Sequence, residues 1–106
     1  MKKIVSLFCL VAFLNPVNLF AFDWKNHDLS HLVVVTNRDA NELTIIDMTK
    51  DEVIGKQEVA LNSQAHMTAF SPDGKKLAIA ATANNLVSVM DLSTNETKDI
   101  HVGSGP

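Results

Sequence analysis

Residues 32–48 read LVVVTNRDANELTIIDM, and residues 77–92 read LAIAATANNLVSVMDL, a second copy of the same pattern. Each copy has an apolar run, an Asn-containing turn, a run of alternating character, and an Asp followed by an apolar residue. Leu32 matches Leu77 at an offset of 45 residues, whereas the Asp near the end of each copy matches at 44. The sequence therefore predicts an internal repeat in which the second turn is one residue shorter.

Both copies have the residue chemistry of β-strands joined by tight turns. Residues 32–36 form a continuous apolar run, as expected of a strand buried on both faces. Asn, Asp and Gly lie between the runs and tolerate left-handed backbone angles. The segment SPDGK, residues 71–75, is a strong turn signal because Pro presets its own φ and Gly accepts a positive φ. The strands are expected at residues 32–36, 42–48, 53–59, 67–70, 76–82, 86–92 and 97–102.

The period of the repeat indicates the architecture. About 40–45 residues is the length of one four-stranded propeller blade. The sequence predicts an all-β fold of about one and three-quarter blades in residues 32–106, with blade one at about 32–60 and blade two at about 61–103. Blade one lacks its first strand, which propellers often supply from the far end of the chain. Propeller rings contain about 4 to 8 blades, whereas this chain supplies fewer than two. We therefore expect a fragment of a 7- or 8-bladed propeller. A small, self-contained secreted β-sandwich is the alternative.

The N-terminus has the pattern of an export signal. Lys2 and Lys3 precede an apolar run at residues 4–14, and a small residue, Ala21, offers a cleavage point before Phe22. Asn and Pro interrupt the apolar stretch, whereas a membrane anchor needs about 20 mostly apolar residues. We therefore predict a signal peptide at 1–21, with a retained anchor as the alternative, and a periplasmic or secreted bacterial protein.

The remaining chain begins with an N-terminal arm at residues 22–31. The single cysteine, Cys9, leaves with the signal, so a disulfide framework is excluded. Loss of the signal also changes the formal net charge from −3 to −5. An acidic chain argues against a nucleic-acid partner, which requires a clustered basic surface. The ligand or protein partner is unknown, and contact with the membrane is expected only through the signal peptide during export.

Three segments resemble a known repeat family. Val33-Val34-Val35-Thr36-Asn37 resembles a Tyr-Val-Thr-Asn signature, with Val in place of Tyr. The segment AFSPDGK, residues 69–75, resembles the Ser-Pro-Asp-Gly-Lys turn of the same repeats. The segment LVSVMDL, residues 86–92, resembles a strand that comes after that turn. Together they resemble the YVTN-type β-propeller family, which includes surface-layer proteins and YncE-like periplasmic proteins. The resemblance covers roughly residues 32–106.

The resemblance implies blade architecture and several functions. Similar blades occur in propellers that carry d1-type haem, in the large subunits of quinone-dependent amine dehydrogenases, and in proteins with a proposed binding role. Related propellers often place a His just before an innermost strand, and His66 lies at that point. A neutral imidazole can ligate iron or another metal. The alternative is a His that ends a strand or packs within a loop.

Other polar residues have simpler interpretations. His27 and His31 have a spacing that could bind zinc on a helix, but no helix is evident, so we interpret them as solvated residues of the arm. Asp47 and Asp91 recur in both copies, which favours a structural role in accepting turn N–H bonds over acid–base chemistry. The structural positions of the repeat are Asn37, Asp47, Pro72, Asp73, Gly74 and Asp91.

The predicted function follows from these features together. The sequence contains none of the common catalytic motifs and requires no cofactor. It predicts an exported propeller protein with a binding or scaffolding role and an unknown ligand. The alternative is the N-terminal part of a redox propeller that carries d1-type haem, or of a quinone-dependent dehydrogenase subunit, with His66 near the ligand.

Overall fold

A computed structural model describes residues 21–60 and 63–106 of the chain. The predicted signal peptide lies outside the described residues, except for Ala21. Within the described ranges, no helix has the length and apolar character needed to cross a bilayer.

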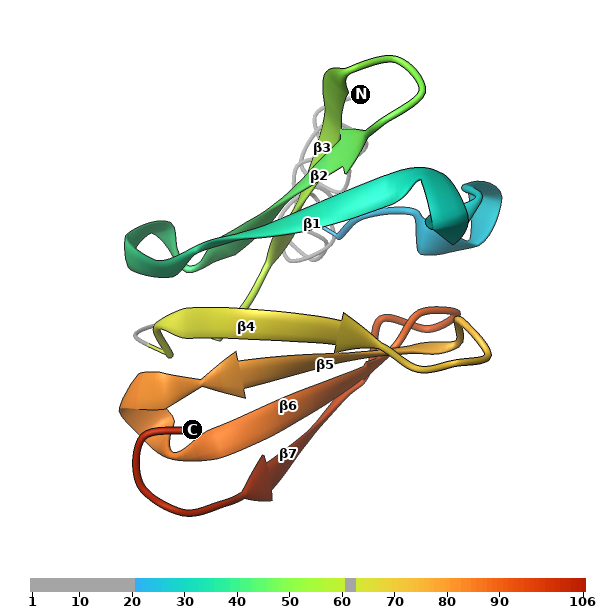
Figure 1. Cartoon of the computed structure of the whole chain (residues 1–106). Coiled ribbons are helices and arrows are strands. Elements are labelled where there is room, and N and C mark those ends of the chain that lie inside the picture. The colour runs from blue at the N-terminus through green and yellow to red at the C-terminus, as the bar shows by residue number, and fades with distance from the viewer. Residues whose placement is uncertain (1–20, 61–62) are drawn as a thin grey trace, which may run out of the picture.

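The described residues form two antiparallel sheets, and within each sheet every strand pairs with the next one in sequence (Figure 1). The first sheet, sheet A, has the strand order β1 (Leu32–Asn37), β2 (Glu42–Asp47) and β3 (Glu52–Glu58). The second sheet, sheet B, has the order β4 (Ala65–Phe70), β5 (Lys76–Ala81), β6 (Leu86–Asp91) and β7 (Thr97–His101). The all-β prediction is confirmed. Single-turn 3-10 helices connect or precede strands: η2 (Trp24–Asn26), η3 (Leu29–His31), η4 (Arg38–Ala40) and η5 (Thr82–Asn84).

Strands β1 and β2 of sheet A repeat as β5 and β6 of sheet B with a single period. The connection from β1 to β2 and that from β5 to β6 each contain a 3-10 turn and then an Asn in the left-handed conformation. These are Asn41, with φ 55° and ψ 39°, and Asn85, with φ 54° and ψ 44°. Both turns have the same length, so β1 corresponds to β5 at an offset of 44 and Val33 corresponds to Leu77.

The predicted offset of 45 between Leu32 and Leu77, and the shorter second turn, are wrong. Two identical leucines suggested that alignment, but the turn sets the register. The correction is significant because a shift of one residue moves a strand's side chains to the opposite face of the sheet.

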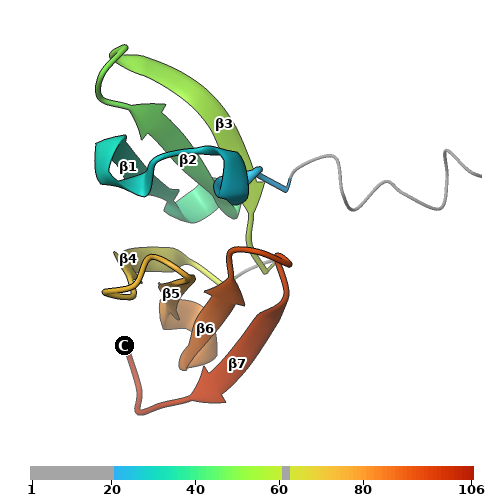
Figure 2. The same cartoon turned by 90° about the vertical axis from the view of Figure 1, so that its right-hand side faces the viewer.

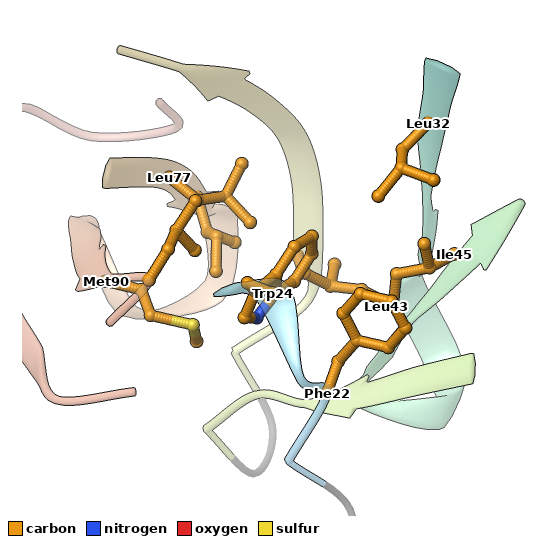
Figure 3. Close-up of a cluster of buried hydrophobic side chains, with 10 residues drawn as sticks. Phe22, Trp24, Leu32, Leu43, Ile45, Leu77 and Met90 are labelled. Carbon is orange, nitrogen blue, oxygen red and sulfur yellow. The ribbon is translucent and has the colours of Figure 1, made fainter. Parts of the chain in front are cut away.

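The strand register gives each sheet one face that points toward the other sheet. Val34 lies opposite Ile45 in sheet A, and Leu77 lies opposite Met90 in sheet B. Side chains from these inner faces meet in one apolar cluster between the sheets (Figure 3). The cluster contains Phe22, Trp24, Leu32, Leu43, Ile45, Ala65, Leu77, Ile79, Met90 and Leu92.

The outer face of β1 differs from the expectation. Residues 32–36 were expected to be buried on both faces, but Val33 is 37% exposed and Val35 is 38% exposed. Both side chains point away from sheet B, and no sheet of the described residues covers them. The prediction is therefore wrong for this side of the strand.

Figure 2 shows the two sheets one above the other, with the N-terminal arm running beside sheet A. The Phe22 and Trp24 side chains of the arm pack in the apolar cluster between the sheets (Figure 3). Trp24 is only 2% exposed, and its ring meets those of Phe22 and Phe70 edge to face, with centroids 4.8 and 6.0 Å away. The side-chain oxygen of Gln57 in β3 accepts two bonds from the arm, from the Trp24 Nε1–H at 3.2 Å and the Phe22 backbone N–H at 3.0 Å. The arm thereby fixes sheet A to sheet B.

Gly55 in β3 makes the arm's position sterically possible. A Cβ atom at this residue would lie 2.5 Å from Cδ1 of the Phe22 ring. Any larger residue would therefore displace Phe22, and with it the backbone N–H that Gln57 binds.

Replacing Trp24 with Ala should lower the free energy of unfolding by about 3–5 kcal/mol, because it removes a large buried ring and leaves a cavity. Urea unfolding followed by far-ultraviolet circular dichroism measures this, since the chain has only one Trp and fluorescence is lost with it. Lys25→Ala, at the exposed neighbouring position, is the control and should unfold at nearly the wild-type urea concentration. Equal midpoints for the two variants would contradict a structural role for the arm.

Candidate functional site

His66 lies at an irregular point of β4. Ala65 pairs with Ala81 and Met67 pairs with Ala80, so His66 is the extra residue of a β-bulge. Bulges bend a strand and redirect its side chains, and they are common beside functional sites. The His66 side chain is exposed, at the start of the edge strand of sheet B.

Two hydrogen bonds join the segment around His66 to Thr36 at the end of β1 and to Arg38 in η4. The Thr36 hydroxyl donates to the His66 carbonyl at 3.1 Å, and Arg38 Nη2 donates to Gln64 Oε1 at 3.1 Å. Gln64 has a positive φ of 51°, which turns the chain into β4. These contacts place Arg38, Gln64 and His66 together where the two sheets meet, and we call these three residues the rim.

The β5–β6 turn supports the rim from the side of sheet B. The Thr82 backbone N–H donates to the Gln64 carbonyl at 3.4 Å, and that of Ala83 donates to the Ser63 carbonyl at 3.1 Å. The rim is therefore held by side-chain donors from the sheet A side and by backbone donors of the β5–β6 turn. Both His66 and Arg38 are exposed, and a guanidinium can bind an anion, whereas an imidazole can supply one ligand to a metal ion.

His27 and His31, whose spacing in the sequence could suit a zinc site on a helix, lie in the arm and outside the rim. His27 is exposed and stacks on the Phe22 ring, with centroids 4.9 Å apart. His31 Nε2 lies 3.3 Å from Asp28 Oδ2, also in solvent. Among residues 21–60 and 63–106, no group of three or more His, Cys, Asp or Glu side chains could hold a metal ion.

Asp47 and Asp91 occupy equivalent positions and make equivalent bonds. Oδ1 of Asp47 accepts from the Thr49 backbone N–H at 2.8 Å and the Thr49 hydroxyl at 2.6 Å. Oδ1 of Asp91 accepts from the backbone N–H and hydroxyl of Ser93 at the same two distances. The hydroxyl bond, followed by the backbone bond, lowers the pKa of both carboxyls. Both aspartates thus close the turn that follows their strand.

Asp73 has the same kind of role in the SPDGK turn. Its Oδ1 accepts from the Ser71 hydroxyl at 2.6 Å and from the Lys75 backbone N–H at 3.0 Å, and the hydroxyl bond is the main cause of its lowered pKa. Gly74 follows with a φ of 70°, and Pro72 is exposed. Asn37, at the end of β1, donates from Nδ2 to the Thr44 hydroxyl on the neighbouring strand.

A cavity of about 390 Å³ opens between the sheets, lined by residues of β3 and β7 and by Ser63. Its walls include the buried Ser63 hydroxyl and the Asn95 side-chain oxygen, neither of which has a hydrogen-bond partner among the described residues. Gln57 also lines it. Sequence reasoning missed this cavity and the role of Gln57, because nothing local marks a Gln whose partners lie 33 to 35 residues earlier.

The comparisons with known proteins place the fold among propellers. No protein-family model and no curated protein matches the chain. Among solved structures, hydrazine synthase from Kuenenia stuttgartiensis matches with a TM-score of 0.62 and 27% identity, over 72% of this chain and 21% of that chain. The dihydro-heme d1 dehydrogenase NirN in complex with DHE matches with a TM-score of 0.52 and 22% identity, over 80% and 17%. The chain thus spans about a fifth of the length of these propeller proteins.

The turn aspartates Asp47 and Asp91 should make the free energy of unfolding fall at acid pH. Because the folded state lowers the pKa of Asp47 and Asp91 below the ordinary 3.8, their stabilisation is complete above that value. It is lost as pH falls through the lowered folded-state pKa. Urea midpoints measured between about pH 6 and pH 2 should therefore fall at the acid end.

The double variant Asp47→Asn, Asp91→Asn should show a smaller fall in midpoint over the same range, because two of the titrating groups are gone. Asp39→Asn, in the exposed η4 turn, is the matched control and should keep the wild-type dependence. The assignment is wrong if the double variant and the wild type give parallel curves.

Proposed function

We propose that the chain is exported by residues 1–21 and acts outside the cytoplasm as a YVTN-type propeller module with a binding or scaffolding role. The signal-peptide pattern supports export. The repeat of β1–β2 as β5–β6 at an offset of 44 residues and the similarity to propeller structures support the blade architecture.

The rim is the observation that carries a binding role. His66 is the exposed, bulged residue of the edge strand β4. Two hydrogen bonds from Thr36 and Arg38 hold this segment against sheet A. Arg38 and Gln64 give the same surface a positive charge and amide groups. A surface fixed by backbone and side-chain bonds from both sheets loses little conformational entropy when it binds a ligand, which favours affinity.

A photo-crosslinking residue in place of His66 tests this role in the living cell. We expect a discrete adduct in the extracytoplasmic fraction with position 66, and none with position 101, where the exposed His101 of β7 is the matched control. Mass spectrometry of the same product should give an N-terminus at Phe22. A pattern of adducts that is identical at the two positions would contradict binding at the rim, and an intact N-terminus would contradict cleavage after Ala21.

A second candidate function is the N-terminal part of a redox propeller. Two observations favour it: one of the matching structures is a dihydro-heme d1 dehydrogenase, and His66 lies near the start of β4. An imidazole can supply an axial nitrogen to haem iron. The fit in this chain is partial, because the His66 side chain is exposed and this chain alone would leave the macrocycle in solvent. Further blades would have to enclose it.

A visible absorption spectrum of the protein purified from its host separates the two candidates. The redox candidate predicts haem bands that d1-type haem restores after extraction, with binding at least about tenfold weaker in His66→Ala. His101→Ala should bind haem like the wild type. A colourless protein whose spectrum is unchanged by added d1-type haem would exclude the redox candidate and leave the binding role.

A further inference from the structure

The outer face of each sheet is the side that points away from the other sheet. The repeat relates these two outer faces to the interface between sheets A and B. At the offset of 44, Val33 corresponds to Leu77, Val35 to Ile79, and Ile46 to Met90. In sheet B, these three residues are buried against sheet A, with 0%, 3% and 2% exposure. The outer face of sheet A thus carries large apolar side chains at the positions that bind a preceding sheet.

The reverse relation holds for the outer face of sheet B. Leu43 and Ile45 of sheet A are fully buried against sheet B, and they correspond to Val87 and Val89. By the strand register, these two valines point away from sheet A, on the side opposite Leu77 and Met90. Other apolar residues share that side: Met67, Ala69, Ala78, Ala80 and Ile100.

The two outer faces are therefore the two unlike halves of an interface that already exists once inside the chain. The sheet A half is exposed at Val33 and Val35. The sheet B half is exposed at Met67 and Ile100 and half-buried at Val87 and Val89. A two-fold symmetric dimer would pair like halves, whereas head-to-tail association pairs unlike halves. A second copy of the same chain carries the complementary half for each face.

We propose that the chain self-associates head to tail, with the outer face of sheet B of one copy packed on the outer face of sheet A of the next. Such heterologous contacts close into a ring when the rotation per copy allows it. Propeller rings have about 4 to 8 blades, and each copy brings two sheets, so about two to four copies complete a ring. The inference goes beyond the proposed function and does not involve His66.

Sedimentation velocity of the purified chain over a range of concentrations tests the proposal. The expected result is association of the wild type into a closed species of two to four copies. Val35→Glu disables the outer face of sheet A, and Val89→Glu disables that of sheet B. Each variant alone should be monomeric at concentrations at least about tenfold above those at which the wild type associates. Lys50→Gln, in the exposed β2–β3 turn, makes the same change in net charge and should associate like the wild type.

Mixing the two variants provides the sharper test. Val35→Glu keeps an intact sheet B face and Val89→Glu keeps an intact sheet A face, so the mixture should form a dimer of one copy of each and nothing larger. Far-ultraviolet circular dichroism checks that each variant is folded, and Val35→Thr and Val89→Thr replace any variant that is not. A wild type that stays monomeric at all concentrations, or variants that associate as it does, would overturn the proposal.

Discussion

The architecture depends on one side-chain oxygen. Gln57 Oε1 accepts from the backbone of Phe22 and from the indole of Trp24, so it holds the arm in the space between the sheets. A three-stranded and a four-stranded antiparallel sheet each have a single inner face to bury, and neither can do so alone. Trp24 contacts residues of both sheets, and Gln57 satisfies the only polar atom of its ring. The apolar cluster and the polar bond are thus parts of the same contact.

The rim is a consequence of this docking. β1 and β4 are both edge strands, and they lie beside each other only because the inner faces are in contact. The bonds from Thr36 to His66 and from Arg38 to Gln64 then form across the boundary between sheets. The residues of the rim are positioned by contacts from both sheets, so a substitution in the arm that disturbs sheet docking should also change the conformation around His66.

Sequence pattern predicted the strands well because their signals are local. Alternation and turn residues such as Asn41, Asn85 and Gly74 located the strands to within one or two residues. The register of the repeat was wrong, because the match of Leu32 with Leu77 was judged from side-chain identity, whereas the length of the turn decides which residues share a face. The bulge at His66 could not be predicted because it depends on the register between β4 and β5, and the burial of Trp24 could not be predicted because it depends on contacts between the sheets.

The N-terminal position of the arm has a consequence for the order of folding. Within each sheet, every strand pairs with the next one along the chain, so the hairpins can form from nearby residues at low cost in loop-closure entropy. The bond between Trp24 and Gln57 spans 33 residues, and the first of its partners to be synthesised is the arm. We expect the Trp24 indole to stay exposed to solvent during synthesis until β3 has been made. During that interval, the aromatic residues that later join the sheets are the part of the chain most open to a chaperone.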